Sequence, residues 1–202
     1  MIKLAKRLFE LKELYLQKLS GNFPNWISPN LVTVVRGLLA WPIIYFLLKE
    51  NYLVAVILLI PAFLLDALDG PLARVKNKVT FFGKLADPVA DKILFVPVVI
   101  IVGLQLLPHY LVWAVVGLEM ILIMNVFILK GLGEILKVNF LPGANMFGKI
   151  KFTVQIIGSI LLLISVYSEA LILPTIIVFW LAVGLALCSI VKHALTFEPK
   201  MK

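Results

Sequence analysis

The chain has 202 residues, of which 62 % are hydrophobic and 15 % are charged, and its formal net charge is +8. Soluble domains average roughly 45–50 % apolar and about 25 % charged residues. The composition therefore excludes a soluble globular protein and a disordered chain, and it indicates an integral membrane protein made of helices. Because Lys and Arg collect in the cytoplasmic loops of such proteins, the positive charge points to one face of a bilayer and not to nucleic acid.

Residues 1–22 form a separate segment at the start of the chain. Its apolar residues recur at about helical spacing with Lys and Glu between them: Ile2, Leu4, Leu8, Leu11 and Tyr15. This pattern predicts an amphipathic juxtamembrane helix that lies on the membrane surface. A solvated helix packed on another subunit is the alternative.

Six later segments approach the roughly 20 apolar residues that a membrane-spanning helix needs. They are Asn30–Leu48, Tyr52–Leu72, Lys84–Leu107, Tyr110–Leu129, Lys149–Val166 and Ile172–Ala194. Lys and Arg crowd the termini and every second loop, whereas the opposite loops hold only Lys49. We therefore expect an all-α integral membrane protein with six transmembrane helices over residues 23–202. Both termini and all basic loops should lie on the cytoplasmic side of the cell membrane.

The single cysteine, Cys188, lies within the last apolar segment. It cannot form an internal disulfide, and a free cysteine in such a run usually behaves as a small hydrophobic residue. We therefore expect Cys188 to pack in the core.

Four aspartates lie at the ends of two predicted membrane helices. Asp66 and Asp69 are three residues apart, and Asp87 and Asp91 are four apart, so each pair shares one helix face. A short loop at residues 74–82 joins the two helices, which places both pairs at the cytoplasmic end of a hairpin. Carboxylates with no His or Cys nearby are hard ligands that suit Mg²⁺ or Mn²⁺ and not zinc. The spacing therefore predicts a metal site.

Small residues and an arginine accompany these aspartates. Gly70 and Gly83 leave room for a phosphate or a nucleotide to approach the backbone, and Ala73 is small. Arg74 can bind a phosphate through the several N–H donors of its guanidinium group. Carboxylates, divalent metals and a phosphate-binding arginine together indicate phosphoryl-transfer chemistry at the membrane surface.

The spacing Asp66-x2-Asp69-Gly70-x2-Ala73-Arg74-x8-Gly83-x3-Asp87-x3-Asp91 resembles the signature of the CDP-alcohol phosphatidyltransferase family, at all eight fixed positions. The six-span layout and the length are also similar, so the resemblance covers residues 23–202. It implies an enzyme that joins a CDP-activated lipid to an alcohol and releases CMP. It also implies a homodimer.

The resemblance implies a role for each residue of the signature. Asp66, Asp69 and Asp87 would be ligands of two divalent ions, Mg²⁺ or Mn²⁺, and Asp91 would be both a ligand and the general base. The CDP pocket would be lined by Gly70, Ala73, Arg74 and Gly83.

The start of the first span resembles the Pro-Asn-x-x-Thr-x-x-Arg element of the same family. Asn30 and Thr33 are expected to touch the nucleotide or the metal-bound phosphates of the CDP-lipid. Arg36, a costly charge inside a span, is expected to face the polar cavity and to bind the acceptor. In the simpler alternative, Asn30 caps a helix and Arg36 pairs with an aspartate.

Residues 148–155 are similar to the Gly-Lys-x-Lys-Thr-x-x-Gln stretch of the phosphatidylglycerophosphate synthases, although Thr153 is displaced by one position. Lys149 and Lys151 are therefore expected to bind the phosphate of glycerol 3-phosphate; alternatively, they are ordinary positive-inside lysines. Glu119 resembles the acid of an Arg-Glu pair in those synthases, but Leu118 precedes it here. We expect Glu119 to pair with a lysine.

The reaction implied is CDP-diacylglycerol plus glycerol 3-phosphate giving phosphatidylglycerol phosphate and CMP. The alternatives within the family are a cardiolipin synthase, with phosphatidylglycerol as acceptor, and an inositol-phosphate phosphatidyltransferase. Outside the family, a divalent-cation transporter would also use intramembrane acids. Against a transporter, the aspartates cluster at one end of their helices and Arg74 adjoins them.

Overall fold

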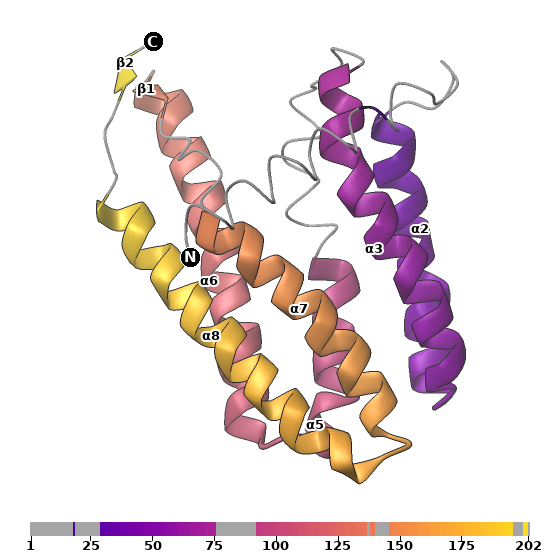
Figure 1. The fold of residues 1–202 in the computed structure, drawn as a ribbon. Helices are drawn as coiled ribbons and strands as arrows, with labels where there is room; N and C mark the ends of the chain where they lie inside the picture. The colour runs from indigo at the N-terminus through magenta and orange to yellow at the C-terminus, as the bar shows by residue number, and fades with distance from the viewer. Residues whose placement is uncertain are drawn as a thin grey trace. The chain divides into compact units, whose positions relative to one another are not determined.

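A computed structural model describes residues 29–75, 92–136, 138–139, 146–195 and 200–201, together with Lys18 (Figure 1). The chain divides into two compact units, Met1–Leu94 and Phe95–Lys202. The regular structure of the described residues is helical, apart from one pair of two-residue strands.

The first unit contains a hairpin of two helices, α2 (Pro29–Leu48) and α3 (Tyr52–Val75). Only residues 49–51 connect them, so the helices are antiparallel neighbours. Their facing surfaces are apolar and include small residues, which let the two backbones approach. The following side chains there are at most 2 % exposed: Ala40, Ile43, Leu47, Ala55, Leu59 and Ala62.

The connection of this hairpin ends α2 in a defined way. Glu50 N–H donates to the Leu47 carbonyl at 3.1 Å, and Asn51 N–H donates to the Phe46 carbonyl at 2.9 Å. These two bonds form a Schellman motif, in which Glu50 takes the left-handed position with φ 57°. Asn51 then caps α3, because its Oδ1 accepts from Val54 N–H at 3.4 Å. The caps on both helices set the register of the hairpin.

The second unit begins within a helix over residues 92–101. The elements that follow are α5 (Gly103–Leu106), α6 (His109–Leu136), β1 (Val138–Asn139), α7 (Met146–Ser165), the 3₁₀ helix η1 (Glu169–Leu171), α8 (Ile172–Leu195) and β2 (Lys200–Met201). α8 packs along α7 and α6. Strands β1 and β2 pair antiparallel, with Val138 opposite Met201.

A close backbone approach and a buried polar contact hold α7 against α8. A Cβ added at Gly158 would lie 3.2 Å from Val178 Cγ1, which is tighter than most contacts of a real Cβ, so glycine favours this close approach. Nearer the loop, the hydroxyls of Ser165 and Thr175 lie 3.0 Å apart. Each hydroxyl also lies within hydrogen-bond distance of a carbonyl one turn back, Leu161 for Ser165 and Leu171 for Thr175. One hydroxyl can therefore donate to its carbonyl while the other donates across to it.

Within the described residues, two helical segments are long and apolar enough to cross a membrane. They are Leu31–Leu48 and Glu169–Val191, with mean hydropathies of 2.0 and 2.6. Four shorter apolar helical segments accompany them: Tyr52–Asp66, Lys92–Leu106, His109–Asn125 and Ile150–Ser165. Large apolar side chains lie on outward faces of α2 and α8, which suits contact with lipid; examples are Leu38, Trp41, Leu173 and Ile177.

Most helix boundaries lie within three residues of the predicted spans, as for α2, α3, α7 and α8. α6 continues to Leu136, seven residues past the predicted end, because Lys130 and Glu134 end the apolar run but not the helix. The third predicted span is interrupted at Val102, and its part before residue 92 lies outside the described residues. So does the 1–22 segment, except for Lys18, which is helical.

The expectation that Cys188 packs in the core is wrong, because its side chain is exposed. The buried face of α8 carries Ala182, Ala186 and Ser189 at helical spacing. Cys188 lies off that face with Leu187 and Val191, which are 49 % and 56 % exposed. A uniformly apolar run does not reveal which face of its helix is buried.

Candidate functional site

A buried ion pair joins the two helices of the first unit. Arg36 on α2 is 0 % exposed. Its Nη1 pairs with Oδ1 of Asp66 on α3, whose side chain is 17 % exposed. A charge removed from water costs several kcal/mol unless an opposite charge and hydrogen bonds compensate for it. The simpler alternative for Arg36, a pairing with an aspartate, is thus confirmed, and acceptor binding by Arg36 stays a prediction.

The pairing follows from equal distances to the hairpin loop. Arg36 lies 12 residues before Leu48, and Asp66 lies 14 residues after Tyr52. At about 1.5 Å of rise per residue, both lie roughly 20 Å from the loop. The next turn of each helix carries Thr33 and Asp69, again at matching levels. The hairpin therefore brings the Asn30–Arg36 element level with the first half of the aspartate signature.

The first half of the predicted metal site lies on one turn of α3. Asp66 and Asp69 are both helical, one turn apart as predicted. Only Asp66 of the four predicted ligands has a described side chain, and the described side chains contain no group of three metal-ligating residues. Carboxylate oxygens are the donors that Mg²⁺ and Mn²⁺ take, so the chemistry of this half fits such an ion. Gly83, Asp87 and Asp91 lie outside the described residues.

The other residues predicted to hold the CDP-lipid lie at the ends of the same two helices. Gly70, Ala73 and Arg74 fall in the last turns of α3, which ends at Val75. Asn30 lies in the first turn of α2. The side chains of these residues lie outside the described set, so their contacts with the nucleotide stay predictions.

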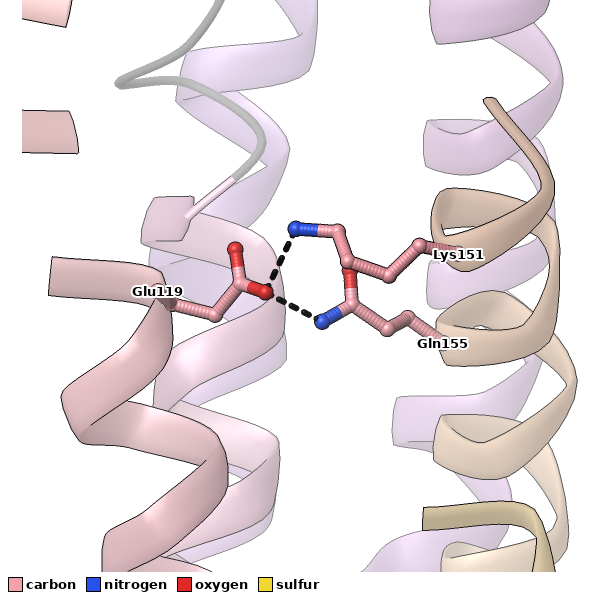
Figure 2. A network of polar contacts seen from close by, with 3 residues as sticks. All are labelled: Glu119, Lys151 and Gln155. Atoms are coloured by element: carbon pink, nitrogen blue, oxygen red, sulfur yellow. Dashed lines mark hydrogen bonds and ion pairs between the residues drawn. The ribbon is translucent and has the colours of Figure 1, made fainter. Parts of the chain in front are cut away.

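A second buried polar cluster lies in the other unit, between α6 and α7 (Figure 2). Lys151 Nζ and Gln155 Nε2 both donate to Glu119 Oε1, each at 2.6 Å. Lys151 is 6 % exposed, Gln155 is 3 % exposed and Glu119 is 1 % exposed. The expectation that Glu119 pairs with a lysine is confirmed. Lys149, the other predicted acceptor residue, lies in the first turn of α7, and its side chain is not among those described.

Helical spacing explains how two donors reach one carboxylate. Lys151 and Gln155 are four residues apart on α7 and therefore share a face. Figure 2 shows both side chains extending from α7 toward Glu119 on α6. No role for Gln155 was predicted from the sequence, although its position one turn after Lys151 is a signal that could have indicated one.

The cluster lies beside a small recess in the second unit. The recess is shallow and has no room for a water molecule, and it is lined by Val115, Leu118, Glu119, Gln155, Ala182, Val183 and Ala186. Within the described part of the chain, the buried Gln155 Oε1 has no hydrogen-bond partner. Most buried acceptors in proteins have a donor, so this oxygen is an exception. The arrangement therefore holds a cation and an anion side by side and leaves one buried acceptor beside them.

Comparisons with known proteins agree with the aspartate signature. The sequence model of the family described as CDP-alcohol phosphatidyltransferase matches residues 26–188. A CDP-diacylglycerol--glycerol-3-phosphate 3-phosphatidyltransferase of Bacillus subtilis (strain 168) is 37 % identical over 68 % of this chain and 70 % of its own. One of Aquifex aeolicus (strain VF5) is 46 % identical over 32 % of this chain and 36 % of its own, so the match spans about a third of that relative.

A relative with a different activity in its name is also similar. Cardiolipin synthase (CMP-forming) of Rattus norvegicus is 33 % identical over 52 % of this chain and 35 % of its own. No solved structure matches the chain. The family match covers most of the chain, including both buried ion pairs and the whole signature, so the protein belongs to the CDP-alcohol phosphatidyltransferase family.

Proposed function

We propose that this chain transfers a phosphatidyl group from CDP-diacylglycerol to glycerol 3-phosphate and so forms phosphatidylglycerol phosphate and CMP. The buried Lys151–Glu119–Gln155 cluster carries this proposal for the acceptor. A lysine buried in an apolar bundle is costly, and a phosphate-bearing acceptor would give it a use beyond its pairing with Glu119. The Bacillus relative, which carries this activity in its name, is similar over most of both chains.

The reaction follows from the roles of the chain's own residues. The acceptor hydroxyl attacks the lipid-side phosphorus, the bond from that phosphorus to the bridging oxygen breaks, and CMP leaves. Asp91 takes the hydroxyl proton. When bound by Asp66, Asp69, Asp87 and Asp91, two Mg²⁺ or Mn²⁺ ions supply positive charge that stabilises the phosphates and the departing CMP. Arg74 and Asn30 hold the CDP moiety, together with Thr33, Gly70, Ala73 and Gly83.

Lys151 and Lys149 hold the acceptor phosphate in this proposal, and Glu119 keeps the Lys151 ammonium charged and oriented. Lys151 is the better placed of the two to act with Glu119, because the pair is already formed at 2.6 Å. Gln155 adds a second donor to the same oxygen and fixes the carboxylate plane. A preorganised cation binds a phosphate at a smaller cost in side-chain entropy.

The membrane arrangement is part of the proposal. Six spans place the signature, both termini and the basic loops on the cytoplasmic side, with residues 1–22 as an amphipathic helix on that surface and a homodimer as the working unit. The distribution of Lys and Arg supports this orientation. The two long apolar helical segments support membrane insertion.

A second candidate acceptor is phosphatidylglycerol, which would make the chain a cardiolipin synthase. Two observations favour it: the similarity to the rat cardiolipin synthase, and Leu118 in the place of an arginine before Glu119. A soluble acceptor and a lipid acceptor give the same by-product, CMP. An assay of CMP release can therefore distinguish the two acceptors only if each acceptor is supplied alone.

The test is CMP release by the full chain in detergent with Mg²⁺ and CDP-diacylglycerol. Glycerol 3-phosphate, phosphatidylglycerol and inositol phosphate are supplied separately, with Asp91→Asn as the inactive variant. Lys49→Met removes a lysine from the loop after α2 and is the matched control that stays active. We expect release with glycerol 3-phosphate alone. Release with phosphatidylglycerol alone would establish the second candidate, and no release with any acceptor would contradict both.

A further inference from the structure

We propose that Arg36 is a positioning residue and the built-in counter-ion of Asp66, and not a ligand of the acceptor. The inference rests on the proposed function in one respect, the assignment of Asp66 to the metal site. Its basis is the ion pair between Arg36 Nη1 and Asp66 Oδ1 across the α2–α3 hairpin.

The burial of the two partners is unequal, and this decides which of them meets a ligand. Arg36 is 0 % exposed and lies among the apolar residues that pack α2 against α3. The Asp66 side chain keeps 17 % of its surface exposed, against 1 % for that of Arg36. An ion or phosphate arriving from outside the hairpin therefore reaches the carboxylate first, with the guanidinium behind it.

A carboxylate has two oxygens with about four lone-pair sites, so one oxygen can accept from a guanidinium while a metal ion ligates it from another direction. Arg36 then does two things. It holds the orientation of the Asp66 carboxylate, and it balances the carboxylate charge whenever the metal is absent. The same positive charge opposes the metal, because a unit charge within a few ångströms changes the binding of a divalent ion by about tenfold even with water-like screening.

The hairpin geometry makes this pairing a fixed feature. Both residues lie near the same level of two capped helices joined by residues 49–51. Arg36 cannot turn toward another site without leaving its buried position between the helices. A mobile acceptor ligand would need a side chain with more freedom, as Lys on a flexible stem has.

The experiment measures metal binding without either substrate. The full chain in detergent is titrated with Mg²⁺, and thermal unfolding reports the concentration of half-saturation. Wild type is compared with Arg36→Met, Arg36→Lys and the control Lys49→Met, which removes a positive charge from the other end of the same hairpin. KM for glycerol 3-phosphate and for CDP-diacylglycerol is measured on the same preparations.

We expect Arg36→Met to unfold at a lower temperature without metal, and to be half-saturated by about tenfold less Mg²⁺. Arg36→Lys keeps the positive charge, so its half-saturation should stay within about twofold of wild type, and Lys49→Met should match wild type. KM for glycerol 3-phosphate should stay within about twofold of wild type, since Arg36 does not touch the acceptor in this proposal.

A raised KM for glycerol 3-phosphate with unchanged Mg²⁺ half-saturation would overturn the inference and assign Arg36 to the acceptor. If Arg36→Met fails to fold, Arg36→Lys decides: a KM for glycerol 3-phosphate raised by about tenfold or more overturns the inference, because a ligand of the acceptor would lose its guanidinium donors. Failure of the proposed function looks different. In that case wild type itself shows no stabilisation by Mg²⁺ and releases no CMP.

Discussion

Replacing Lys151 by Met tests the buried cluster of the second unit most directly. The substitution keeps the length and the apolar stem of the side chain and removes only the ammonium. Glu119, 1 % exposed, then keeps the hydrogen bond from Gln155 Nε2 at 2.6 Å and loses its ion pair with Lys151. The carboxylate must either stay charged in a dry bundle or take up a proton.

The expected loss is large because both partners are buried. Removing one member of a buried ion pair destabilises proteins by about 3–5 kcal/mol, since the other charge is left uncompensated. Exposed pairs give about 1 kcal/mol or less. With Lys151 at 6 % and Glu119 at 1 % exposure, we expect Lys151→Met to fall in the first range. The free energy of unfolding in mixed detergent micelles, measured by denaturant titration, gives the value.

A double variant separates structure from function. Glu119→Gln combined with Lys151→Met removes both charges, and an amide at position 119 can still accept from Gln155. We expect stability to return to within about 1 kcal/mol of wild type. Acceptor binding should not return, because the phosphate has lost its charged donor. KM for glycerol 3-phosphate should stay raised by about tenfold or more, with KM for CDP-diacylglycerol unchanged.

Ser159→Ala is the matched control on the same helix. Its hydroxyl donates to the Gln155 carbonyl at 2.9 Å, and its loss should cost about 1 kcal/mol or less. A Lys151→Met variant as stable as Ser159→Ala would refute the buried pair. A double variant that recovers both stability and acceptor affinity would refute the role of Lys151 in binding and leave the pair purely structural.

Three further substitutions test the packing of the helices, each by unfolding in the same micelles. Glu50→Gly should stabilise the chain by about 1 kcal/mol, because Glu50 holds φ 57°, a conformation that costs an L-residue roughly that much; a loss of stability would contradict the Schellman motif. Gly158→Ala should be less stable than Gly184→Ala by about 1–3 kcal/mol, since an added Cβ meets Val178 at 3.2 Å in the first case and nothing within 4 Å in the second. Cys188→Ser should change stability by about 0.5 kcal/mol or less because the side chain is exposed, and a loss of several kcal/mol would place it in the core after all.

The family and most of the helices could be predicted from the amino-acid sequence. Eight positions of one signature, Asp66 to Asp91, identify the family without a structure, because their spacing is local and specific. Long apolar runs locate α2, α3, α7 and α8 to within three residues, because a helix in lipid must be apolar over its whole span. The same criterion placed the end of α6 too early, since a helix can continue past its last apolar turn.

The partners of the charged residues could be identified only from the packing of the helices. The spacing of Lys151 and Gln155 shows that they share a face, but not that Glu119, 32 and 36 residues away, receives both of their hydrogen bonds. Arg36 had two open interpretations in the sequence, and its pairing with Asp66 depends on the register that the short Lys49–Asn51 connection imposes. Cys188 shows the same limit for apolar residues. Composition and spacing act along one helix, whereas partners and buried faces depend on how each helix is rotated and shifted against its neighbours.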